Sequence, residues 1–432
     1  MEDVTRTKYF NQIFKPIISI SKFVGLTFIS GNHISEKDKI LKLYSILRLV
    51  YQLILGMTLT TASMSVIYLN NSGIGKDEDI HLFQMQITNL TAVINLFVTQ
   101  FKTKNNVEDV LRRMLLLDKL LKTDDATYIN NARFIKKLII TFMPLVMLFT
   151  LLDFVTYASD YVSLLYTIAI DFSIIIHLIF VMQYVSFIYL IRERLKLLNS
   201  YILTPKIINK NSRRILYSDL GIININTDTN LYKLLLSDEL SDSTDEQINS
   251  ETNFGTMVNS FDAYRLKLHF QLLRVAQEVL CDISSSINII YGFQVLLLFV
   301  MLFTEPTCNL YYVILHIATG SNLNKETSIN VLVTAPLWVS FYFFIILFVT
   351  GLCNLTSNEA KRTGILLQRL QLIPELQTST LNEVQHFLHQ VSHRKIKFTA
   401  WDIFTIDLKL LGSIVGTITT LLVILIQFNK IV

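Results

Sequence analysis

The feature that most constrains this chain is a series of long apolar blocks with few or no charged residues. A helix that crosses the hydrocarbon core needs about 20 mostly apolar residues, because lipid offers no hydrogen-bond partner to exposed backbone. Only 17% of the residues are charged, below the roughly 25% typical of soluble domains. We therefore predict an all-α polytopic membrane protein with seven transmembrane helices. The predicted spans are Tyr44–Leu69, Leu82–Phe101, Leu138–Tyr157, Val162–Ile191, Ile287–Ile317, Ile329–Leu355 and Phe404–Phe428.

Lysine and arginine are distributed unequally between the two sides of these spans. The segment before the first span, the loop between the second and third, and the loops after the fourth and sixth are rich in both residues. The other side carries only Lys76, Lys325 and Lys430. Positively charged loops remain in the cytoplasm. We therefore expect a cytoplasmic N-terminus and an extracellular C-terminus, the reverse of a G-protein-coupled receptor.

The loops on the predicted cytoplasmic side contain further helices. In Val107–Lys122 leucines recur at helical spacing with charges between them, and Phe261–Ile283 repeats this pattern before the fifth span. Such helices need apolar partners, which could be each other, a neighbouring subunit or the inner leaflet. The fourth and fifth spans are longer than the hydrocarbon requires, so we expect them to continue as helix into water or to tilt.

These patterns divide the chain into six regions. The stretch Ser237–Glu251 is acidic and almost without apolar residues, which predicts a disordered linker. Lysines near the N-terminus interrupt any apolar core, so no cleavable signal peptide is expected and the first span would direct insertion. The first half of the chain contains a cytoplasmic segment 1–43, then spans one to four in 44–204 with a cytoplasmic helical loop 102–137. A cytoplasmic linker 205–252 follows. The second half contains a cytoplasmic helix and spans five and six in 253–355, a cytoplasmic loop 356–403, and the last span in 404–432.

The last span carries a stripe of small and polar residues. Ser413, Thr420 and Gln427 are spaced by seven, which places them on one helical face, and Gly412 and Gly416 form a GxxxG pattern. Such a stripe suits close packing against another helix or the lining of a water-filled path built from several copies. Gln427 is large for a close crossing and lies at the outer end, where a constriction could open and close. These two details favour a pore.

The end of this span resembles a known family. Thr420 is followed by apolar residues and then by Gln427-Phe428, similar to the Thr-Tyr, five apolar, Gln-Phe motif that ends insect gustatory receptors. Leu421 stands where that family usually has tyrosine. The approach to the span, Phe398–Ala400 and then Phe404–Asp407, is also similar to the family. Within the family, Leu422–Phe428 most resembles the fructose-receptor branch.

The resemblance implies a homotetrameric, ligand-gated, non-selective cation channel in the plasma membrane. The last spans of the subunits would line a central pore, and a ligand site in each subunit would open to the outside within the outer leaflet. The expected ligand is a small polar tastant, such as the sugar fructose. The implied pore and gate residues are Ser413, Thr417, Thr420, Ile424, Gln427 and Phe428.

Carboxylates and aromatic side chains gather at the predicted outer ends of spans three to six. A sugar offers hydroxyls to carboxylates and ring faces to aromatic side chains, and carboxylates at membrane depth point to function. Asp171 is a first choice because it lies well inside the fourth span, and Trp338 because it follows Pro336, which can bend a helix around a cavity. The carboxylates could instead reach the interface, and the tyrosines could form an aromatic belt. The candidate residues are Asp153, Tyr166, Asp171, Glu305, Tyr312, Thr334, Trp338 and Tyr342.

Two alternatives remain at this stage. An olfactory-type channel for an apolar ligand would lack pocket carboxylates, and Asp171 and Glu305 argue against it. A polytopic transporter would often show internal repeats, and none is convincing in this sequence. We expect no enzyme, metal or cofactor, because metal-ligand spacing, a nucleophile elbow and a phosphate-binding glycine loop are not found. The cysteines are expected to be buried and unpaired. The expected partners are the tastant, the bilayer and further copies of the chain, without nucleic acid.

Overall fold

The computed structural model describes most of the helical part of the chain. It covers residues 50, 54, 56, 57, 61, 76–102, 104–157, 161–203, 251–319, 325–372 and 377–431. The predicted N-terminal segment 1–43 lies outside the described residues. So do most of the predicted first span, Tyr44–Leu69, and nearly all of the predicted linker 205–252.

The predicted later spans are helices of the observed fold. They correspond to α3 (Lys76–Lys102), α5 (Asp125–Tyr157), α6 (Tyr161–Leu203), α9 (Glu251–Thr319), α10 (Lys325–Gln371) and α12 (Leu408–Ile431). Among the described residues, five of these helices are long and apolar enough to cross a membrane, namely α5, α6, α9, α10 and α12. The helical, multi-pass character of the chain is therefore confirmed, while the count of seven and the orientation remain predictions.

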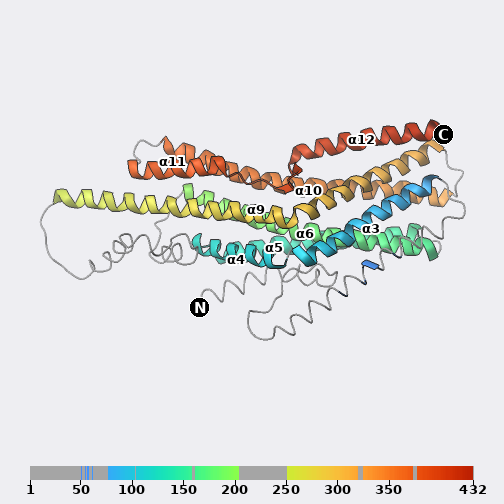
Figure 1. The fold of residues 1–432 in the computed structure, drawn as a ribbon, viewed down its shortest axis with the longest axis horizontal. Helices are drawn as coiled ribbons and strands as arrows, with labels where there is room; N and C mark the ends of the chain where they lie inside the picture. Colours follow the sequence, from blue (N-terminus) through green and yellow to red (C-terminus); the bar gives the residue numbers. More distant parts are fainter. Residues whose placement is uncertain are drawn as a thin grey trace.

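Several helices extend far beyond the thickness of a bilayer. Helix α6 has 43 residues, α9 has 69 and α10 has 47. At 1.5 Å per residue α9 is about 100 Å long, against about 30 Å for the hydrocarbon core. Figure 1 shows α9 running along most of the long axis of the molecule. The expectation that spans four and five continue as helix is confirmed, and α9 contains the amphipathic stretch Phe261–Ile283 without a break.

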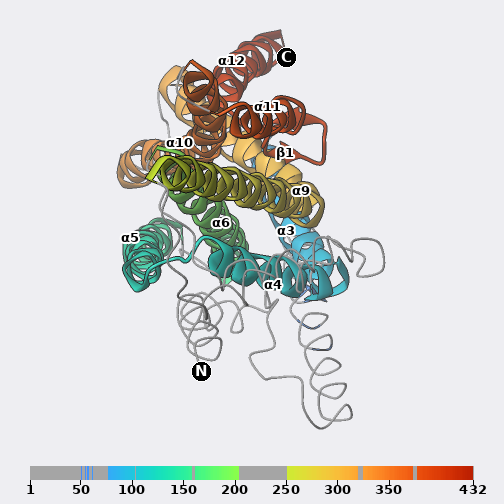
Figure 2. The same ribbon diagram turned by 90° about the vertical axis from the view of Figure 1, so that its left-hand side faces the viewer.

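Two shorter helices cover α9 near the end of the molecule that is remote from the C-terminus of α12. Helix α4 (Lys104–Leu120) and helix α11 (Thr378–His393) lie on opposite sides of α9 (Figures 1 and 2). Their apolar faces are buried, with Met114 and Leu117 on α4 and Val384 and Phe387 on α11. The apolar partners predicted for the amphipathic α4 are therefore supplied within the same chain.

A fully buried ion pair joins α4 to α6. The guanidinium of Arg194 donates from Nε to Asp118 Oδ1 at 3.0 Å and from Nη2 to Asp118 Oδ2 at 2.9 Å. The hydroxyls of Thr123 and Tyr128 donate to the same carboxylate at 3.1 and 2.9 Å. Neither charged side chain is exposed at all. The carboxylate is thus surrounded by donors, as burial of a charge requires.

A short β-hairpin precedes α12, where the sequence predicted the end of a loop and the first residues of the last span; the helix begins at Leu408 and not at Phe404. Strands β1 (Thr399–Ala400) and β2 (Phe404–Thr405) pair in antiparallel fashion, with Thr399 opposite Thr405. Trp401 and Asp402 at its tip adopt φ values of 50° and 58°. The tip lies against Gly292 of α9, where an added Cβ would stand 2.9 Å from Trp401 N. Glycine is therefore needed for this close approach.

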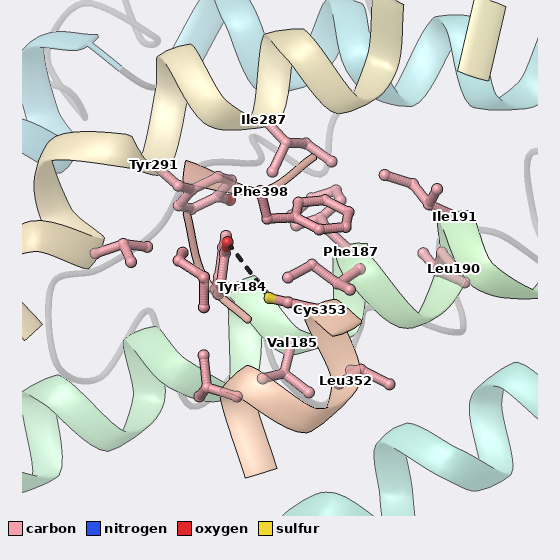
Figure 3. Close-up of a cluster of buried hydrophobic side chains, with 14 of the residues drawn as sticks. Tyr184, Val185, Phe187, Leu190, Ile191, Ile287, Tyr291, Leu352, Cys353 and Phe398 are labelled. Atoms are coloured by element: carbon pink, nitrogen blue, oxygen red, sulfur yellow. Dashed lines mark hydrogen bonds between the residues drawn. The ribbon is translucent and has the colours of Figure 1, made fainter. Parts of the chain in front are cut away.

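The hairpin is also held by hydrogen bonds and by the core. Asn288 of α9 donates to the Lys397 carbonyl at 2.7 Å and accepts from the Thr399 amide at 3.3 Å. Figure 3 shows Phe398 beside Tyr291, Phe187 and Cys353, where α6, α9 and α10 meet. The Sγ atom of Cys353 lies 3.9 Å from the Tyr184 hydroxyl. The three cysteines are buried and form no disulfide, as predicted. The chain entering α12 is thus anchored to the centre of the bundle.

Candidate functional site

The carboxylate of Glu305 joins three helices. It lies on α9 and is 1% exposed. Gln84 Nε2 donates to it at 2.6 Å, the Thr88 hydroxyl donates to its other oxygen, and the Tyr342 hydroxyl donates at 3.2 Å. These donors come from α3 and α10. A carboxylate removed from water needs such partners, so Glu305 fixes the relative positions of α3, α9 and α10.

A second carboxylate is held by a tryptophan. The indole Nε1 of Trp338 on α10 lies 2.9 Å from each carboxylate oxygen of Asp153 on α5. Tyr342, one turn later, stacks on Trp338 with ring centroids 5.5 Å apart and an interplanar angle of 23°. Phe149 lies on the α5 side, with its ring centroid 5.0 Å from that of Trp338. A continuous chain of contacts therefore runs from Asp153 through Trp338 and Tyr342 to Glu305.

Asp171 is the third carboxylate of this region. It lies on α6, is 9% exposed, and its Oδ1 is buried without a hydrogen-bond partner among the described residues. It is close enough to Asp153 and Tyr342 to interact with both electrostatically. We call Asp153, Asp171, Glu305, Trp338 and Tyr342 the carboxylate–aromatic cluster. All five belong to the predicted set of ligand-site residues.

The other predicted ligand residues lie on helices α6, α9 and α10, which also carry members of the cluster. Tyr312 of α9 is buried and packs edge-on against Tyr311, with centroids 6.1 Å apart. Thr334 is buried one turn before Trp338. Tyr166 lies in α6, and its side chain is outside the described part. Their assignment to a ligand site therefore remains a prediction.

The sequence analysis missed the contribution of α3. Gln84 and Thr88 are four residues apart, so they share a helical face, and both are buried against Glu305. Farther along the helix, Asn89 accepts from Ser173 of α6 at 2.6 Å, and Thr99 accepts from Gln294 of α9 at 2.8 Å. A stripe of amides and hydroxyls within an apolar span was the available signal for this interface.

Helix α12 presents its polar face away from the rest of the chain. Ser413, Thr417, Thr420, Ile424 and Gln427 are exposed, and among the described side chains of this helix only Ile418 is buried. Figure 1 shows α12 along one edge of the bundle. A Cβ added at Gly412 or Gly416 would meet nothing within 4 Å, so no described part of this chain packs on the GxxxG pattern. The side chain of Phe428 lies outside the described part.

The polar groups of α12 are partly satisfied within the helix. The hydroxyls of Thr417 and Thr420 donate to the carbonyls of Ser413 and Gly416 at 2.8 and 2.9 Å. Asp407 caps the start of the helix, since its Oδ1 accepts from the Lys409 and Leu410 amides at 3.0 and 3.2 Å. The helix thus begins at a defined residue beside the anchored hairpin and exposes an apolar surface with a polar stripe.

Comparison with known proteins places these features in a family context. Residues 230–431 match the model of the 7tm chemosensory receptor family. Gustatory receptor 68a of Drosophila melanogaster is 28% identical over 156 residues, covering 35% of this chain and 39% of the relative. The Drosophila gustatory receptor for bitter taste 66a is 29% identical over 166 residues, covering 37% and 30%. These matches therefore span about two fifths or less of the length of each relative.

The fold is shared over a greater length. The insect olfactory receptor OR5 from Machilis hrabei, in its structure with eugenol, superposes with a TM-score of 0.64. The alignment covers 97% of this chain and 100% of that one at 10% sequence identity. A second structure of the same receptor gives the same TM-score and sequence identity. At this identity the likeness concerns the fold alone.

Proposed function

This chain is a multi-pass plasma-membrane protein related to the insect gustatory receptors, and we propose that it is a ligand-gated, non-selective cation channel opened by a small polar tastant. The observation that carries the proposal is the exposed face of α12. A transmembrane helix that turns small and polar residues away from its own bundle needs another helix or pore water on that side.

The proposed assembly is a homotetramer with the α12 helices around a central axis. Gln427 and Phe428 would form the gate near the outer mouth, and Ser413, Thr417, Thr420 and Ile424 would line the path below it. A narrow ring of amide and apolar side chains expels water and blocks ions. Rotation or bending of α12 would remove this ring from the axis, and the threonine stripe would then line a wetter path.

The proposed orientation has a cytoplasmic N-terminus and an extracellular C-terminus. Segment 1–43, loop 102–137, linker 205–252 and loop 356–403 would then be cytoplasmic. In this arrangement α4, α11 and the adjoining ends of α9 and α10 form an intracellular bundle. The carboxylate–aromatic cluster falls in the outer half of the membrane, at the opposite end of the same long helices.

The proposed ligand site is the carboxylate–aromatic cluster together with Tyr166 of α6, Tyr312 of α9 and Thr334 of α10. The rings of Trp338 and Tyr342 can stack on a sugar ring, and the carboxylates can accept hydrogen bonds from its hydroxyls. Fructose is the sugar that the resemblance of the last span favours. The cluster joins α3, α5, α9 and α10, so a ligand that binds it differently in two helix arrangements can shift the channel between them.

The test is to express the chain alone and record current while applying a panel of sugars and apolar volatiles. Trp338→Ala removes both the stacking ring and the donor to Asp153, so it should weaken the response to the activating ligand by about tenfold or more. Trp401→Phe is the matched control, because the second of the two tryptophans lies in the hairpin. Surface labelling should show equal amounts of each variant.

Three outcomes would count against parts of the proposal. Activation by apolar volatiles, with no response to any sugar, would support the olfactory-type alternative. An unchanged dose response of Trp338→Ala would place the ligand elsewhere. The absence of any current from surface-expressed protein, with every compound in the panel, would refute a channel made by this chain alone.

A further inference from the structure

We propose that the carboxylate–aromatic cluster binds small organic cations, with the ammonium group placed at Asp171 and its alkyl groups against Trp338 and Tyr342. This inference rests on the proposed ligand-gated function and extends the ligand class of the same site beyond neutral sugars. It follows from three observations: an unsatisfied carboxylate oxygen, a missing counter-charge and adjacent aromatic rings.

The first observation is the difference between Asp171 and its two neighbours. Glu305 accepts from three side chains, and Asp153 accepts from the indole of Trp338. Asp171 is also nine-tenths buried, yet its Oδ1 has no partner among the described residues. Leaving a buried polar oxygen without a donor is unfavourable, and more so when the oxygen is charged. Asp171 therefore lacks a partner that a ligand could supply.

The second observation concerns charge. Among the described residues, the stretches of α3, α5, α6, α9 and α10 on either side of the cluster contain no lysine or arginine, namely 82–101, 138–157, 161–191, 287–319 and 329–360. Asp171 lies close enough to Asp153, and Asp153 close enough to Glu305, for the three acidic groups to interact electrostatically. A sugar would provide hydroxyl donors to these groups but no positive charge. An ammonium group provides a positive charge as well, and ionic hydrogen bonds are roughly twice as strong as neutral ones.

The third observation is the aromatic wall. Trp338 and Tyr342 are stacked beside the carboxylates, and Phe149 and Phe341 lie with ring centroids 5.0 and 5.7 Å from that of Trp338. Aromatic rings attract cations, and they also bury methyl groups on nitrogen. Because Asp153 holds the indole nitrogen, the ring of Trp338 is fixed in orientation before any ligand arrives. The cluster therefore combines charge and rings in a preorganised form.

The experiment compares a cation with a neutral molecule of the same shape. Choline and 3,3-dimethylbutan-1-ol differ by replacement of a quaternary nitrogen with carbon. Their binding to the purified full-length chain can be followed through the fluorescence of Trp338, with Trp401→Phe removing the second tryptophan. We expect choline to bind at least about tenfold more tightly than the alcohol, because only choline carries a positive charge that can pair with the desolvated carboxylate and rest on the aromatic rings. Methylammonium and tetramethylammonium define the size that the site accepts.

Two variants locate the effect. Asp171→Asn keeps the shape and removes the charge, so it should reduce choline affinity about tenfold or more and leave the alcohol unchanged. Asp171→Glu should retain the preference for the cation. Asp109→Asn makes the same chemical change at a half-exposed ion pair on α4 and should have no effect.

The outcomes separate this inference from the proposed channel. Equal affinity for choline and the alcohol in the parent protein would overturn the inference, and so would failure to bind any of the three ammonium compounds. A channel opened by sugars would survive either result. Conversely, a preference for choline that depends on Asp171, in a protein that never conducts, would support the site and refute the channel.

Discussion

The ion pair between Asp118 and Arg194 offers a direct test of how α4 and α6 are held together. Asp118→Asn preserves the shape of the side chain but leaves the guanidinium of Arg194 without a counter-charge. That guanidinium is completely buried, and its Nε and Nη2 both donate to the carboxylate. Removing one partner of a buried pair typically costs about 3–5 kcal/mol, because the remaining charge is desolvated and uncompensated.

The neighbouring donors allow the size of the effect to be calibrated. Tyr128→Phe removes one hydrogen bond to the same carboxylate, so it should lower the free energy of unfolding by about 1–2 kcal/mol, clearly less than Asp118→Asn. Replacing both charged residues together, with Asp118→Leu and Arg194→Met, should destabilise the protein far less than either single change. Buried ion pairs exchanged for apolar groups of similar volume are often neutral or stabilising.

The assay is the apparent melting temperature of the purified protein in detergent, together with the amount that reaches the cell surface. We expect Asp118→Asn and Arg194→Met each to lower both measures strongly, Tyr128→Phe to lower them slightly, and the double variant to recover most of the loss. Single variants that melt with the parent would refute the argument. A fall in the melting temperature of the double variant equal to the sum of the falls of the two single variants would also refute the argument.

Three further predictions concern the hairpin, the gate and the orientation. Gly292→Ala places a Cβ 2.9 Å from Trp401 N and 3.2 Å from Trp401 Cα, so it should displace the hairpin and reduce the ligand-evoked current. Gly351→Ala is the control, because its added Cβ meets nothing within 4 Å, and it should behave as the parent in the same recordings. Gln427→Ala should change the resting leak or the evoked current, and Phe428→Ala should raise the leak; parental behaviour of both would make the α12 stripe a packing seam. A tag after Val432 should be stained on intact cells and a tag before Met1 should not, and the opposite pattern would reverse the proposed topology.

Local patterns in the sequence were sufficient for most of the helical elements, although α11 lies in a region that was predicted only as a loop. Hydropathy and helical periodicity depend only on residues close together in the chain, so they predicted α5, α6, α9, α10 and α12 as apolar helices and α4 as an amphipathic one. The spacing of Ser413, Thr420 and Gln427 predicted that they share a face, and the structure exposes all three. The family relationship also rested on a short local motif.

The candidate site was predicted only as a set of residues at one end of the spans. The sequence could not show that Trp338 contacts Asp153, which is 185 positions away, or that Gln84 contacts Glu305, which is 221 positions away. These pairings depend on the rotation of each helix about its axis and on which helices are neighbours. The contribution of Gln84 and Thr88 from α3 was missed for the same reason, although the amides and hydroxyls of this apolar span are visible in the sequence.

By itself, then, the sequence determined where the helices lie, which of them suit a membrane, and which face of the last span is polar. The tertiary structure decided that Glu305 and Asp153 are satisfied while Asp171 is left with an unpartnered oxygen. It also decided that the β1–β2 hairpin packs on Gly292 and that Asp118 and Arg194 form a buried ion pair. The physical reason is that burial and hydrogen bonding of a polar group depend on donors brought by distant helices, which only the packed bundle places within reach.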